Sequence, residues 1–167
     1  MPRGLALLGG SLFVAERNNA RVTRFDGVAG LANGAPASRV LGQTSYFTNT
    51  PGISQDHFAF PSRLAADNRG RLYVSDGFDA NRVLVFEAAT ALPNGAPASA
   101  VLGQNNYTDQ GAGLAQNRFD MDSAGSGVAV DPIFNRLLVA DDNNNRVMIF
   151  EAGEDLGWVV FLPLGRR

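Results

Sequence analysis

The sequence predicts an all-β chain that is assembled from copies of one unit, and three observations lead to this prediction. The hexapeptide NGAPAS occurs at residues 33–38 and again at residues 94–99. Apolar segments that end in an acidic residue occur three times, as SLFVAE (11–16), RLYVSD (71–76) and RLLVAD (136–141). After a short polar loop, each is followed by a related segment, ARVTRF (20–25), NRVLVF (81–86) or NRVMIF (145–150). Self-similarity at a regular spacing is the sequence signature of a repeat architecture.

The repeated segments are predicted to be β-strands. They are short, rich in Val, Leu, Ile, Phe and Tyr, and bounded by Gly, Asn, Asp and Pro. One unit then contains four strands, which are expected to run in the order VLGQ, GVAVD, RLYVSD and NRVLVF. Polar links such as DNRG (67–70), DGFDA (76–80) and DDNN (141–144) are suited to tight turns. In this order NGAPAS connects the outermost strand of one unit to the innermost strand of the next.

Four-stranded antiparallel units with two apolar faces bury both faces when they stack radially, as the blades of a β-propeller do. The prediction is a single domain over residues 1–167 with about three blades, which is half of a six-bladed propeller. The predicted limits are a partial blade at 1–26, blades at 38–87 and 99–151, and a closing strand at 157–165.

Two long insertions follow the VLGQ segments, at residues 44–61 and 105–126. Both are polar, and their aromatic residues keep the offset of the repeat: Tyr46 with Tyr107, and Phe58 with Phe119. We expect these aromatics to pin the insertions onto the blades. We also expect the insertions and the Asp-rich loops to share one rim of the propeller.

Composition excludes several classes of function. The net charge is -2 and the pI is about 5.3, so there is no basic field of the kind that binds nucleic-acid backbones. The absence of Cys excludes disulfides, thiolate zinc sites and thiol catalysis. No apolar run is long enough to span a membrane, and the LALLGGSLFVA stretch (5–15) fits the repeat better than a signal peptide. The sequence calls for no metal and no cofactor.

RLYVSDGFDANRVLVF and RLLVADDNNNRVMIF resemble NHL repeats, the propeller-forming unit of many bacterial and animal proteins. VLGQ followed by a long polar stretch is similar to the extended NHL units of some bacterial exported proteins. The resemblance implies a ring of about six blades, a binding role and an extracellular or periplasmic location. Two features depart from it: Glu16 stands where the other copies have Asp76 and Asp141, and the repeat spacing is longer than usual.

Candidate binding residues are sought where the copies differ, because a site needs unlike groups at one point whereas shared residues serve the scaffold. The six candidates are His57, Phe78, Asp79, Asp120, Asp122 and Asp142. No catalytic residue and no metal ligand is predicted among them. The repeated pairs Asp76 with Arg82 and Asp141 with Arg146 are instead expected to be structural clasps between adjacent strands.

Two other motifs are given structural interpretations. DDNNN (141–145) opens like a calcium loop, but Arg146 and Ala152 stand where Gly and a bidentate Glu are needed. His57 is the only histidine, so a Ser-His-Asp relay would have to use it and a His-based metal triad is impossible. A packing or surface role is favoured for this residue.

The favoured function is a non-catalytic interaction propeller whose loop rim binds a protein, peptide or glycan. An enzyme of the lyase or metal-dependent lactonase type is the alternative, and a structural module of a longer surface protein is a third. Three blades leave two apolar faces bare, and each buried side chain is worth about 1.5–3 kcal/mol. We therefore expect a homodimer that completes a six-bladed ring, with the C-terminal strand of each subunit completing the N-terminal blade of its partner.

Overall fold

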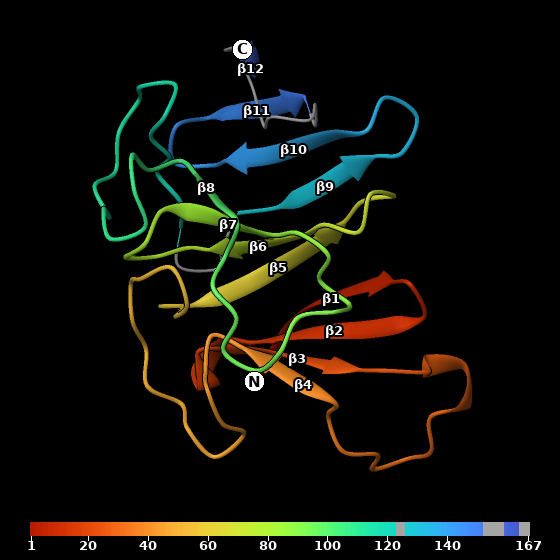
Figure 1. The fold of residues 1–167 in the computed structure, drawn as a ribbon. Coiled ribbons are helices and arrows are strands. Elements are labelled where there is room, and N and C mark those ends of the chain that lie inside the picture. Colours follow the sequence, from red (N-terminus) through yellow and green to blue (C-terminus); the bar gives the residue numbers. More distant parts are fainter. Residues whose placement is uncertain (123–125, 152–158, 164–167) are drawn as a thin grey trace.

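The computed structural model describes residues 1–122, 126–151 and 159–163. In this part of the chain, twelve strands form three four-stranded antiparallel sheets that follow one another in chain order (Figure 1). The first sheet contains β1 (Pro2–Leu8), β2 (Ser11–Glu16), β3 (Arg21–Phe25) and β4 (Arg39–Leu41). The second contains β5 (Pro61–Ala66), β6 (Leu72–Asp76), β7 (Arg82–Phe86) and β8 (Ala100–Leu102). The third contains β9 (Val128–Asp131), β10 (Arg136–Asp141), β11 (Arg146–Glu151) and β12 (Val159–Pro163).

Short 3₁₀ turns (Arg17–Asn19 and Val28–Gly30) are the helical elements among the described residues. The described chain therefore has no helix long and apolar enough to cross a bilayer. The all-β class predicted from the sequence is confirmed.

The second sheet lies between the other two, and its innermost strand β5 contacts both β1 and β9 (Figure 1). Alternation along β6 explains how one sheet serves two neighbours, because successive side chains point to opposite faces. Leu72 and Val74 enter the core shared with the first sheet, whereas Tyr73 enters the core shared with the third sheet. Two apolar cores thus hold the stack together.

The order of strands within a unit differs from the prediction. β4 and β8, which carry the VLGQ segments, pair with β3 and β7 and are the last strands of their sheets rather than the first of the next. NGAPAS consequently lies between the third and fourth strands of one sheet, and not between two blades. It still joins neighbouring sheets, since the Asn94 side chain and the Gly95 amide bond the backbone of Val40 on β4.

The predicted limits at the two ends of the chain are corrected in the same way. Residues 1–26 are not a partial blade, because β4 completes their sheet from within the same chain. The closing strand does form, as β12 at 159–163, but it pairs with β11 of its own third sheet. The predicted exchange of this strand between two subunits differs from this pairing and stays a prediction about the assembled protein. The remaining residues of the predicted closing strand, 157, 158, 164 and 165, lie outside the described part.

The LGQ residues at the ends of β4 and β8 anchor the insertions. Gly42 and Gly103 have positive φ values of 81° and 84°, and a Cβ on either would lie 2.1 Å and 2.0 Å from the rings of Phe58 and Phe119. These rings are fully buried, as expected for aromatics that pin the insertions. The glutamine that follows each glycine donates to the backbone of the neighbouring loop, from Gln43 to the Ala20 carbonyl (3.1 Å) for example.

Both predicted acid–arginine clasps form at the end of the second strand of their sheets, and a third pair of the same kind forms in the first sheet. Arg82 pairs with Asp76 across the β6–β7 loop at 3.0 Å, and neither side chain is exposed. Arg146 pairs with Asp141 in the third sheet, and Arg21 pairs with Glu16 in the first. Burial raises the pKa of Asp76, and this effect exceeds the lowering by Arg82 and two backbone amides.

Substituting Gly103 with Ala tests the anchoring contact, with Gly34→Ala as the matched control. Both glycines have positive φ (84° and 78°), but a Cβ on Gly34 meets nothing within 4 Å. The strained backbone should cost each variant about 1–2 kcal/mol. Gly103→Ala should lose about 1–3 kcal/mol more, because the Phe119 ring must move. Urea denaturation measures both, and equal losses would show that the glycine–phenylalanine contact adds no stability.

Candidate functional site

The long insertions and the loops after the second strands lie on one side of the stack, which we call the loop rim (Figure 1). Direct contacts join them. The Arg82 guanidinium donates to the His57 carbonyl (2.8 Å), and the Gln104 amide donates to the Asn81 carbonyl (3.0 Å). The prediction that insertions and Asp-rich loops share one rim is confirmed.

Three of the candidate aspartates, Asp120, Asp122 and Asp142, lie on the rim between the second and third sheets, and we call them the carboxylate cluster. Asp142 accepts hydrogen bonds from the Asp122 amide (3.3 Å) and the Ser126 hydroxyl. Asp120 accepts a hydrogen bond from the Asn143 side chain at 2.9 Å. The insertion and the β10–β11 loop are thus tied together by the polar groups that distinguish this copy of the repeat.

Phe78 and Asp79 lie next to this cluster, because the Phe78 amide donates to the Asp122 carbonyl at 3.2 Å. Phe78 has a φ of 58°, which is unusual for a bulky residue, and the residue is 47% exposed. Its ring meets Phe60 edge-on with 5.4 Å between centroids, and the Arg17 guanidinium lies 5.2 Å from the Phe60 ring. Five of the six predicted residues therefore belong to one region of the rim.

His57 is the exception among the candidates. Its Nδ1 lies 3.0 Å from Asp56 and 3.3 Å from the Ser54 hydroxyl, within its own insertion. Its carbonyl is held by Arg82. Among the described residues, no hydrogen bond or ion pair joins its ring to the carboxylate cluster, so the structure does not bring His57 together with the other candidates.

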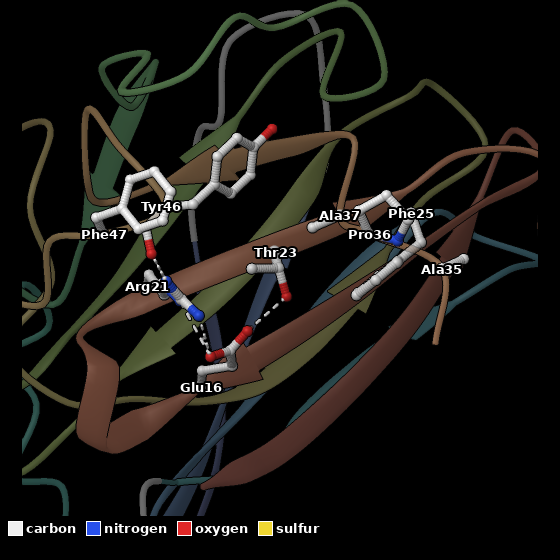
Figure 2. Close-up of a pocket in the computed structure, with 9 residues that line it drawn as sticks. All are labelled: Glu16, Arg21, Thr23, Phe25, Ala35, Pro36, Ala37, Tyr46 and Phe47. Carbon is white, nitrogen blue, oxygen red and sulfur yellow. Dashed lines mark hydrogen bonds and ion pairs between the residues drawn. The ribbon is translucent and has the colours of Figure 1, made fainter. Parts of the chain in front are cut away.

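Figure 2 shows a second surface feature, a hollow of about 440 Å³ on the outer face of the first sheet, which we call the Glu16 hollow. Strands β2 and β3, the first NGAPAS and the first insertion supply its lining: Glu16, Arg21, Thr23, Phe25, Ala35, Pro36, Ala37, Tyr46 and Phe47. The sequence did not predict this site. Its signal was present in Glu16, which departs from the aspartate of the other copies.

Glu16 is the charged centre of the hollow. It accepts hydrogen bonds from Asn19, Arg21 and Thr23, at 2.6, 3.0 and 2.8 Å. Burial raises the pKa of Glu16, but these three donors together outweigh it and hold the pKa below its ordinary value. The carboxylate is therefore ionised and paired, with 17% of its side chain exposed.

The described residues include no group of three or more His, Cys, Asp or Glu side chains that could hold a metal ion. In the carboxylate cluster, Asp142 accepts from a backbone amide and a hydroxyl, and Asp120 accepts from a side-chain amide.

Comparisons with known proteins agree with this architecture. The NHL repeat model matches residues 58–86, which span the end of the first insertion and strands β5–β7. Among solved structures, the chain is similar to one in a nidogen/laminin complex, with 13% identity and a TM-score of 0.56 over 96% of this chain and 47% of that one. The WD40 repeats of RRP9 give 14% identity and a TM-score of 0.55 over 96% and 38%. A catalytically inactive virginiamycin B lyase from Staphylococcus aureus, with quinupristin, gives 12% and 0.56 over 99% and 42%.

These likenesses define the fold as that of an NHL/WD40-like β-propeller. The chain contains an NHL repeat at residues 58–86, so the resemblance found in the sequence is confirmed there. It spans less than half the length of each structure named above.

The lowered pKa of Glu16 predicts how the stability of the protein depends on pH. A carboxyl with a lowered pKa in the folded state stabilises that state above its ordinary pKa, and loses this contribution as pH falls through the folded value. The stability difference between the protein and Glu16→Gln should therefore be largest above pH 4.5 and should shrink below it. Thermal melts from pH 7 to pH 3 measure it, and a difference independent of pH would contradict the assignment.

Proposed function

We propose that the protein is a non-catalytic interaction module that presents its loop rim to a protein, peptide or glycan. The observation that carries the proposal is Phe78, a large apolar side chain held half exposed on a left-handed backbone beside the carboxylate cluster. Strained, exposed residues of this kind concentrate at binding sites. An aromatic face next to acidic groups offers both stacking and polar contacts to a ligand.

Binding to peptide and glycan arrays tests the rim. The double variant Phe78→Ala/Asp79→Ala should lose binding that the unmodified protein shows. Phe134→Ala is the matched control, because Phe134 is also exposed (69%) but lies in the β9–β10 turn at the opposite ends of the strands. Retained binding by the double variant, or equal loss in the control, would place the contact elsewhere.

The same variants should fold normally. Phe78→Ala removes the edge-on contact with Phe60 and should cost about 0.5–1.5 kcal/mol. Asp79→Ala should stay within about 0.5 kcal/mol, because the residue is exposed.

The enzyme alternative, of the lyase or lactonase type, has the fold likeness as its support. The described residues add to it only the contact of His57 with Asp56, two neighbouring residues of one insertion. The rim region around Phe78 gives the binding function a more specific basis.

We also propose that the two outer faces of the stack are closed by a second copy, to give a six-bladed ring. Repeat positions support this. Leu5 pairs with Val14 as Leu64 pairs with Val74, yet Leu5 is 64% exposed and Leu64 is 8% exposed. The outer face of the first sheet thus presents side chains that the second sheet buries against a neighbour.

Light scattering on the purified protein measures the closure. The expected mass is that of two chains, twice 17.7 kDa. Leu5→Asp should reduce it to one chain, because a charge on a buried apolar face disfavours association. Asp79→Ala, on the rim, should leave the mass unchanged. A stable, folded monomer of the unmodified protein would refute the dimer.

A further inference from the structure

The Glu16 hollow has filled counterparts in the other two sheets. In the second sheet the residues at the same repeat positions are Asp76, Arg82 and Phe86, and the Phe58 ring lies over Phe86 with 5.9 Å between centroids. The Asp76 and Arg82 side chains are fully buried there, whereas Glu16 and Arg21 are 17% and 18% exposed. What covers the clasp in the second sheet is the first insertion.

The backbone on either side of Phe58 makes the covering specific. The residue before it, His57, accepts a hydrogen bond from the Arg82 guanidinium at 2.8 Å through its carbonyl. The two residues after it, Ala59 and Phe60, donate their amides to the Asp76 carboxylate at 3.2 and 2.7 Å. The covering segment therefore presents, in chain order, a carbonyl to the arginine, a phenylalanine ring to Phe86 and amides to the aspartate.

The third sheet repeats this arrangement with a different sequence. Phe119 lies 6.0 Å from Phe150, centroid to centroid. The residue before it, Arg118, accepts from Arg146 through its carbonyl. The residue after it, Asp120, donates its amide to Asp141 at 2.7 Å. Two copies with unlike side chains around the phenylalanine thus share one binding geometry.

The second NGAPAS supplies a further contact to the covering segment. Gln55 donates its side-chain amide to the Ala98 carbonyl, and its own carbonyl accepts from the Ala98 amide, both at 2.8 Å. Ala98 is 1% exposed. Ala37 holds the same position in the first NGAPAS, lines the Glu16 hollow and is only half buried.

We infer that the Glu16 hollow is a docking site for an extended, phenylalanine-bearing segment of a polypeptide of the same repeat type. The carbonyl before the phenylalanine binds Arg21, the amides after it bind Glu16, and the ring packs on Phe25. A glutamine three residues earlier pairs with Ala37. The acidic residue, the arginine and the aromatic residue are already in place around the hollow (Figure 2). This inference builds on the proposed closure of the outer face but uses loop contacts rather than sheet packing.

A peptide with the sequence of residues 52–60, GISQDHFAF, is the probe, titrated into the ¹⁵N-labelled full chain. Saturable shifts are expected for the amides of Glu16, Arg21 and Phe25. The same peptide with Phe58→Ala should bind more weakly by a factor of about ten or more, because the buried ring is lost. Absence of saturable shifts, or equal affinity of the two peptides, would overturn the inference.

Variants of the chain locate the site. Phe25→Ala should lower the affinity of the chain for the peptide about tenfold. Phe134→Ala, which removes an exposed phenylalanine on the third sheet, should bind like the unmodified protein. Undiminished binding to Phe25→Ala would also overturn the inference.

A linked version keeps the test decisive if Phe25→Ala does not fold. Pro2 pairs with Glu16 as Pro61 pairs with Asp76, so residues 52–60 placed directly before Pro2, in place of Met1, enter in the register of the natural insertion. This extension should raise the thermal midpoint above that of the same extension carrying Phe58→Ala, and equal midpoints would refute docking. Mass measurements separate the two proposals. If the protein is a monomer and still binds the peptide, the docking site is supported and the dimer is refuted.

Discussion

The buried pair of Asp76 and Arg82 is the interaction on which the arrangement of loops and sheets depends. The guanidinium bonds the aspartate, the His57 carbonyl of the insertion before the sheet and the Tyr107 carbonyl of the insertion after it. Removing one partner from a buried pair leaves an uncompensated charge, which is strongly destabilising. The buried pair holds both insertions in place through these hydrogen bonds. The pair depends on the insertions in return, because its remaining donors and acceptors are buried from solvent and need protein partners.

This mutual dependence explains how the described parts of the insertions are held on the sheets although they are long, polar and rich in glycine. Their aromatic residues supply buried area, as Phe58 and Phe119 do, and their backbones supply the hydrogen bonds that the clasps need. The rim is therefore built on buried clasps and buried aromatic rings. Residues that are not part of the clasps, such as Phe78 and Asp79, remain available at its surface.

The repeat predicted the strands, the clasps and the anchoring aromatics, because each is written into local sequence at a fixed offset. It did not predict where a unit begins. A periodic chain contains the same strands whichever strand is counted first, and only pairing between distant residues, such as Val22 with Leu41, fixes the frame. The VLGQ strand was misplaced for this reason, and the limits of the terminal blades with it.

The candidate site was predictable to a similar degree. Differences between the copies pointed to Asp120, Asp122 and Asp142, and their loops do meet. The same logic failed for His57, since a residue can differ between copies and still serve its own insertion. The Glu16 hollow was not predicted, because it differs from the other two sheets in lacking an insertion over its clasp. Whether an insertion covers a clasp depends on tertiary contacts and cannot be recognised from a local sequence pattern.

The two outer faces of the stack are unlike each other, and this limits how they can be closed. In the second sheet, Leu72 and Val74 face the preceding sheet, whereas Tyr73 faces the following one. On the outer face of the first sheet, Leu12 and Val14 hold the repeat positions of Leu72 and Val74. On the outer face of the third sheet, Leu138 holds the repeat position of Tyr73. Faces of these two kinds already pack together twice within the chain. A closing contact of the same geometry joins a first sheet to a third sheet, head to tail, and two copies would make that contact twice around one ring.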